Sequence, residues 1–197
     1  PEMKEKEAKK PEKEKPKPQP IFTDKNLESA VRHEVYAKRY NDEPITKEDV
    51  AKISRVVGKG MKITNLDGLQ HAKQLMLIDL EDNQITDLKP IAELKRLQSV
   101  TLAKNAIADL GPLKDLKAMQ LLDLSNNQVA DLSALASMSN LRTLYVADNK
   151  IETLSPIAKL TKIWSLDASG NQVVDLASVK DLRWITTLDI TGNQVKT

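Results

Sequence analysis

The sequence contains no cysteine, and this absence excludes both a disulfide framework and a metal site built on thiolates. Its two histidines, His33 and His71, have no matching ligands nearby, so we expect neither a metal site nor a cofactor. Aromatic residues make up only 3% of the chain, which argues against stacking on single-stranded bases. No apolar run approaches the roughly 20 residues of a membrane span.

The charge is also close to balanced, with 30 basic and 28 acidic residues. The first twenty residues hold seven Lys and five Glu, so residues 21–197 hold 23 basic and 23 acidic side chains. A nucleic-acid-binding domain needs a clustered basic face, so nucleic acid is not an expected partner. No nucleophile paired with a base and no pair of catalytic carboxylates stands out, so we expect no enzymatic activity.

What the sequence does contain is a repeat. Asparagines recur every 22 residues without slippage, and a fixed period of this length indicates stacked structural repeats. Apolar residues five and three positions before each asparagine alternate as in a half-buried strand. Each coil should supply one short strand, a turn and a return segment, and coils bury their apolar sides only by stacking. The asparagines are Asn83, Asn105, Asn127, Asn149, Asn171 and Asn193.

The asparagines are expected to be structural. An amide both donates and accepts hydrogen bonds, so it can satisfy backbone groups left unpaired where the strand bends away. Aspartates four residues after most of these asparagines are interpreted as hydrogen-bond acceptors in turns rather than calcium ligands. These are Asp87, Asp109, Asp131 and Asp175. Pro90, Pro112 and Pro156 should open short helical turns in the return segments.

Three regions are predicted. Residues 1–20 read as a charged Lys/Glu/Pro tether, residues 21–57 as a helical N-terminal cap, and residues 58–197 as the repeat array. In the cap, Thr23 is predicted to cap a first helix, with Phe22 and Leu27 as a hydrophobic staple. Thr46 and Asp49 form a capping box for a second helix.

The two ends of the array depart from the repeat. The first coil is degenerate: Gly58 stands where a strand leucine is expected, and Gly58–Gly60 is interpreted as a loose turn. The chain stops just past Asn193 with no visible C-terminal cap, so either it continues or a neighbour covers that end. It begins at Pro1 rather than Met, so processing is expected, and a lipid anchor upstream of Pro1 is a further expectation.

The segments LMLIDLEDNQITDLKPI (residues 75–91) and LLDLSNNQVADLSAL (residues 121–135) resemble the 22-residue leucine-rich repeats of bacterial internalin-like proteins. The short repeats of a eukaryotic phosphatase regulator are similar. The cap segments FTDKNLESAVRHEV and ITKEDVAKI look like the helical cap of bacterial secreted members. The resemblance implies a right-handed α/β solenoid, with parallel strands on its concave side and 3₁₀ turns on its convex side. It also implies protein recognition rather than catalysis, in an extracytoplasmic location.

The candidate contact surface consists of strand residues between the buried positions, which should line the concave side. They form a mildly acidic surface of mostly small residues on which Leu77 and Leu121 are expected to be exposed. The set is Leu77, Asp79, Thr101, Leu121, Asp123, Thr143, Tyr145, Ser165 and Asp167. Trp164 and Trp184 lie near strand starts, off the buried register, and suggest an adjoining contact patch.

Two interpretations of these residues remain open. The aspartates either meet basic groups of a partner or are solvated repeat consensus, and the tryptophans either form a contact or pack the edge of the last coils. The leading functional hypothesis is a non-enzymatic module that binds a protein partner. The alternative is an accessory subunit of a larger cell-envelope assembly, held by the tether and the uncapped coil.

Overall fold

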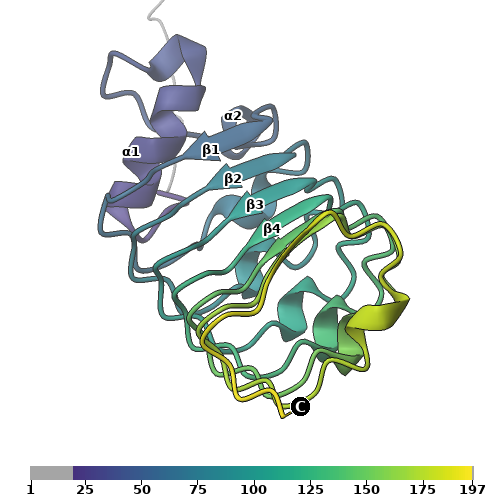
Figure 1. Ribbon diagram of the computed structural model, residues 1–197. Coiled ribbons are helices and arrows are strands. Elements are labelled where there is room, and N and C mark those ends of the chain that lie inside the picture. The colour runs from purple at the N-terminus through teal and green to yellow at the C-terminus, as the bar shows by residue number, and fades with distance from the viewer. Residues whose placement is uncertain (1–19, 197) are drawn as a thin grey trace, which may run out of the picture.

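The computed structural model describes residues 20–196, so the predicted tether lies outside the described residues except for Pro20. Within that range seven three-residue strands form one parallel sheet in sequence order (Figure 1). Neighbouring strands pair residues that are 22 positions apart, such as Val56 with Ile78. The strands are β1 (Arg55–Val57), β2 (Leu77–Asp79), β3 (Ser99–Thr101), β4 (Leu121–Asp123), β5 (Thr143–Tyr145), β6 (Ser165–Asp167) and β7 (Thr187–Asp189).

Each of the first six strands is followed by a return segment that contains a 3₁₀ turn, and this arrangement confirms the predicted leucine-rich repeat solenoid. Three of these turns have a proline near their start, as predicted: Pro90, Pro112 and Pro156. Their fixed φ and missing N–H suit that position. The turns of the array are Leu69–His71, Lys89–Ile91, Gly111–Leu113, Ser133–Leu135, Ser155–Ile157 and Val179–Asp181.

The core is a stack of identical layers between the strands and the turns. The middle residue of each inner strand is fully buried, as Leu122, Leu144 and Leu166 show with no exposed surface. The residues on either side of it point outward and are mostly half-buried. Burial weakens only in the last coil, where the equivalent Leu188 is 41% exposed.

A ladder of asparagine amides joins the coils on the side where the strands end. Asn127 Oδ1 accepts from the backbone N–H of Ile107 at 2.9 Å. Its Nδ2 donates to the carbonyls of Leu102 at 2.9 Å and Leu124 at 3.0 Å. The other five asparagines make the same set of contacts, which confirms their structural role. No buried side-chain N or O atom lacks a partner in residues 20–196.

The turn aspartates also act as predicted. Asp87, Asp109, Asp131 and Asp175 each accept a hydrogen bond from the backbone N–H two residues further on, at 2.7–2.9 Å. Thr153 occupies the same repeat position, and its hydroxyl oxygen accepts the corresponding hydrogen bond from Ser155 N–H. Each of these carboxylates therefore stabilises the turn in which it lies.

The N-terminal cap contains α1 (Lys25–Glu34), a 3₁₀ turn (Tyr36–Lys38) and α2 (Lys47–Val50), and α1 lies against β1 (Figure 1). The capping box of Thr46 and Asp49 is confirmed. The prediction that Thr23 caps α1 is wrong by one residue, because Asp24 takes that place. A carboxylate can accept at both oxygens, and Asp24 uses the second one to bind the first coil at Thr64.

Lys59 and Gly60 form a turn, as predicted for Gly58–Gly60, but Gly58 itself stays in the strand pairing. Its N–H donates to Asp79 O at 2.9 Å and Gly60 N–H donates to Glu81 O at 2.9 Å, so the backbone continues the pairing of β1 with β2. A Cβ at Gly58 would lie 3.0 Å from Ala30 Cβ in α1 and 3.1 Å from Leu80. Glycine stands where the repeat has leucine because the cap helix occupies the space of that side chain.

Replacing Leu122 with Ala should lower the free energy of unfolding by about 2–5 kcal/mol, because it leaves a cavity in a fully buried layer. Denaturant unfolding followed by circular dichroism measures the change. Gln128→Ala, at an exposed site of the same coil, is the control and should stay within about 0.5 kcal/mol of wild type. Equal stability of the two variants would show that the repeat register is wrong.

Asn127→Ala should lower the free energy of unfolding by roughly 1–3 kcal/mol, because Ile107 N–H and the carbonyls of Leu102 and Leu124 lose their buried partner. Asn127→Asp should also destabilise the fold, since a carboxylate accepts from Ile107 but donates to neither carbonyl. Both variants are compared with wild type by thermal melting. A neutral effect of both substitutions would contradict the structural role of the ladder.

The stability of the cap should depend on pH through Asp24. Burial acts to raise the pKa of this carboxyl, but hydrogen bonds from Thr64, Leu27 and Asn26 outweigh it and hold the pKa below its ordinary value. The resulting stabilisation is complete above the unfolded-state pKa of about 3.9 and is lost as the pH falls through the lower folded-state value. Asp24→Asn should therefore be less stable than wild type near neutral pH, and this difference should shrink below about pH 4. Denaturant unfolding across that range measures it, and a difference that stays constant would contradict the assignment.

Candidate functional site

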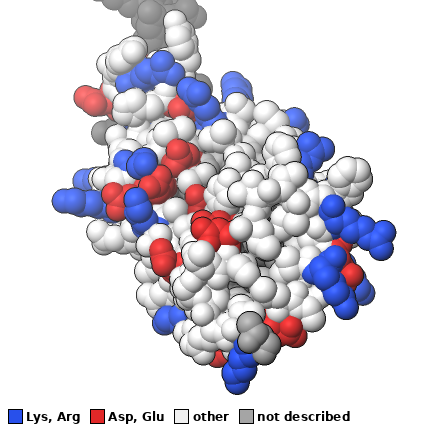
Figure 2. Space-filling model, viewed as in Figure 1, with Lys and Arg blue, Asp and Glu red and all other residues white. Residues whose placement is uncertain are grey.

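The strand side of the molecule carries a row of carboxylates at the strand ends, and Figure 2 shows acidic side chains gathered there with Lys and Arg on both flanks. Asp79, Asp123 and Asp167 are the last residues of β2, β4 and β6, and all are half-buried. In each of them Oδ1 accepts from the backbone N–H two residues later, at 3.4, 3.0 and 3.0 Å. This contact fixes the orientation of each carboxylate.

Tyr145 lies within this row. It ends β5 and stands in register with Asp123 on one side and Asp167 on the other. Adjacent strands are about 4.8 Å apart, so the phenol has a carboxylate on each flank. The three side chains together present an aromatic surface edged by hydrogen-bond acceptors, which suits a Lys or Arg side chain.

The first residues of the strands form a second row, which is less exposed than predicted. Leu77 and Leu121 were expected to be exposed but are half-buried. Parallel neighbours about 4.8 Å away cover the flanks of each side chain, so single-strand alternation overstates exposure. Ser99 and Ser165 are also half-buried, and Thr143 is only 9% exposed.

Trp164 accounts for the burial of Thr143. The residue stands just before β6, and its Nε1 donates to Thr143 Oγ1 at 3.0 Å. The indole remains 54% exposed, and Trp184 in the next coil is 71% exposed. Neither ring is packed into the core, so the structure brings the two predicted tryptophans to the surface.

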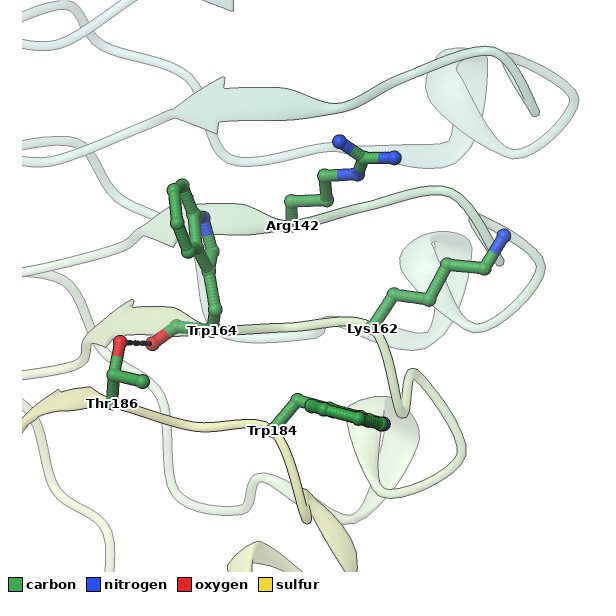
Figure 3. Close-up of a pocket in the computed structure, with 5 residues that line it drawn as sticks. All are labelled: Arg142, Lys162, Trp164, Trp184 and Thr186. Atoms are coloured by element: carbon green, nitrogen blue, oxygen red, sulfur yellow. Dashed lines mark hydrogen bonds between the residues drawn. The ribbon is translucent and has the colours of Figure 1, made fainter.

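Sequence reasoning missed the basic residues that join them. Arg142, Lys162, Trp164, Trp184 and Thr186 line a pocket of about 390 Å³ beside the strand starts (Figure 3). Arg142, Trp164 and Thr186 hold the same repeat position in three successive coils, and so do Lys162 and Trp184 in two. Figure 3 shows Lys162 and Trp184 extending in the same direction from successive coils, with Trp164 on the coil of Lys162 and Arg142 on the coil before it. The 22-residue offset between these positions is the signal that could have revealed the group.

The charges on the two sides of the strands differ in their pairing. At the strand ends of the first coils, Glu81 forms salt bridges with Lys59 at 2.6 Å and Lys104 at 3.1 Å. Hydrogen bonds from these two ammonium groups lower the pKa of Glu81. At the pocket, Lys162 Nζ donates to the neutral Asn140 Oδ1 at 2.8 Å. Across residues 20–196, neither Arg142 nor Lys162 forms a salt bridge.

Two exposed tyrosines in the cap were also missed. Tyr36 and Tyr40 are 87% and 92% exposed, and the Arg39 guanidinium lies 6.0 Å from the Tyr36 ring. Their i and i+4 spacing in a polar segment could have marked them. They lie in the cap region, away from the later strands, and they provide a useful internal comparison.

The described chain offers little for other chemistries. Among residues 20–196 no group of three or more His, Asp or Glu side chains could hold a metal ion. In the same range no helix combines the length and apolar character needed to cross a bilayer.

Residues 95–137 and 117–159 match the family described as Leucine Rich repeats (2 copies). No curated protein matches the sequence. An internalin (inlF) from Listeria monocytogenes has a similar structure, with a TM-score of 0.72 and 26% identity over 90% of this chain and 58% of the internalin.

Two further structures are similar. Internalin C2 from Listeria monocytogenes has a TM-score of 0.71 and 28% identity, over 90% of this chain and 88% of that one. A leucine-rich repeat protein from Leptospira interrogans has a TM-score of 0.71 and 24% identity, over 78% of this chain and 41% of that one, which shows a shared fold. The chain thus spans only part of the length of several relatives.

Proposed function

Because the chain is an internalin-like leucine-rich repeat protein, we propose that it is a non-enzymatic module that binds a protein partner through its concave strand face and the flanking aromatic residues. Stacked repeats create an extended surface on which each coil contributes side chains at the same height. The observation that carries the proposal is Tyr145, held between Asp123 and Asp167 at the centre of that surface.

The expected partner carries basic side chains where it meets this face. Fixed carboxylates attract Lys and Arg and orient an approaching partner, whereas tyrosine and tryptophan are enriched among the few residues that supply most of the binding energy of an interface. The contact residues proposed on the strands are Leu77, Asp79, Thr101, Leu121, Asp123, Thr143, Tyr145, Ser165 and Asp167, with Trp164 and Trp184 beside them. Thr143 would act indirectly, since it is buried and holds the Trp164 indole.

An extracytoplasmic location is part of the proposal. It is supported by the similarity to two Listeria internalins. The absence of cysteine is compatible with this location, because the fold then needs neither reduced thiols nor disulfides. Protease treatment of intact cells of the native source, followed by immunoblotting, tests the location.

The double substitution Leu121→Ala/Tyr145→Ala should reduce partner binding at least about tenfold, because it removes the central apolar and aromatic contacts of the face. The protein is immobilised and exposed to an extract of its native source, and retained proteins are compared between variants by mass spectrometry. A single protein should be retained by wild type and depleted from the variant. Circular dichroism should show an unchanged fold.

The matched control is Tyr36→Ala/Tyr40→Ala, which removes two exposed aromatic residues from the cap instead. It should retain the partner at the wild-type level. Undiminished capture by the strand-face variant, or a loss confined to the cap variant, would reject the proposed face.

A further inference from the structure

We propose that the pocket between Trp164 and Trp184 binds an acidic segment of the partner, an Asp or Glu side chain adjacent to a proline or aliphatic residue. This inference rests on the proposed function, since it assumes a protein partner. It specifies which chemical groups one subsite binds and in which orientation the partner lies on the strands. The pocket of about 390 Å³ falls within the range of about 300–1,000 Å³ typical of ligand sites.

The hydrogen-bonding groups of the pocket are mostly donors. The Thr186 hydroxyl donates to Trp164 O at 3.0 Å, and Trp164 Nε1 donates to Thr143, so both are already engaged. Lys162 uses one of its three donors on Asn140. The Arg142 guanidinium carries five donors and no acceptor. The lining therefore offers mainly donors, and no carboxylate lines the pocket.

The charge of the pocket complements a carboxylate. Two cations and two indoles line it, and within residues 20–196 neither cation is neutralised by a salt bridge. A carboxylate supplies only acceptors and matches a guanidinium in a bidentate geometry. Hydrogen bonds to charged groups are stronger than those between neutral groups.

The two indoles suit an apolar group in the ligand. Trp164 and Trp184 keep 54% and 71% of their surface exposed, although indoles in folded proteins are usually highly buried. A ring of this size gains most when an apolar group covers its face. A residue next to the carboxylate, such as proline or an aliphatic side chain, would supply that cover.

Opposite charges lie at the two ends of the strands. Arg142 stands just before β5 and Lys162 shortly before β6, whereas Asp123 and Asp167 end β4 and β6. The basic pocket and the acidic row thus lie at opposite ends of the same short strands. A partner with an acidic group at the strand starts and basic groups at the strand ends would bind in one orientation only.

A neutral oligosaccharide fits these residues less well. Sugar hydroxyls both donate and accept, and the pocket offers few acceptors for their protons. Binding of an oligosaccharide would be a different result, so oligosaccharides are included in the experiment below.

The chain contains two tryptophans, Trp164 and Trp184, so intrinsic tryptophan emission reports on this pocket alone. A random octapeptide library displayed on phage is selected on the immobilised full chain. Selected peptides are synthesised together with twins in which Glu or Asp is replaced by Gln or Asn. Each is titrated into the protein while tryptophan emission is recorded, and neutral and uronic-acid oligosaccharides are titrated in parallel.

The selected peptides should be enriched in Asp or Glu beside an apolar residue and should shift the emission to shorter wavelength. Replacing the acid by its amide should weaken binding at least about tenfold, as the loss of a hydrogen bond to a charged group predicts. Arg142→Gln/Lys162→Gln should cause a similar loss. The control Lys150→Gln/Lys159→Gln removes the same charge from exposed sites outside the pocket and should bind as wild type does.

Three results would overturn the proposal: selected peptides without acidic residues, equal binding of the acid and amide twins, or binding of an oligosaccharide but of no peptide. Failure of this inference is separable from failure of the proposed function, because Leu121 and Tyr145 do not line the pocket. Loss of the partner from Leu121→Ala/Tyr145→Ala, together with unchanged partner binding by Arg142→Gln/Lys162→Gln, would keep the function and reject the acidic subsite.

Discussion

The hydrogen bonds that join one asparagine amide to the preceding coil are the constraint on which the structure depends. Each strand has only three residues, too few to hold a sheet by backbone pairing alone. The chain must also leave the strand at a sharp bend, which exposes carbonyls and N–H groups inside the molecule. Asn83 and its five equivalents satisfy these groups and fix the distance between coils at the same time. Leucine layers can then stack without a buried polar cost.

This fixed spacing has a direct effect on the surface. Positions 22 residues apart lie side by side, so a binding group needs only one suitable residue from each of several coils. Tyr145 has carboxylates on both flanks for this reason. Arg142, Trp164 and Thr186 meet for the same reason, although no two of them are close in sequence. The array is a scaffold whose surface can vary while its interior stays constant.

The sequence predicts the fold well because each repeat position occurs in several coils, so its residue types can be compared. The buried leucines, the ladder asparagines and the turn aspartates are confirmed on this basis. The errors fall where the period does not apply. Thr23 and Asp24 both belong to the residue types favoured as caps, and Asp24 in addition bonds the first coil at Thr64. Gly58 depends on how closely α1 approaches, and the partial burial of Leu77 depends on neighbouring strands. The two tryptophans were found as unusual exposed residues, whereas the basic residues beside them carry no signal until the coils are aligned.

The way the ladder is built also bears on how such a chain can change over generations. Every coil presents the same backbone groups to the next, so a whole 22-residue unit could be duplicated or lost with its neighbours still matched. A pocket assembled from three successive coils has no such tolerance. An extra unit inserted between the coils of Arg142 and Trp164 would leave a folded array and separate the cation from the indole. Selection on ligand recognition would therefore fix the number of repeats locally, even where stability alone would permit the array to grow or shrink.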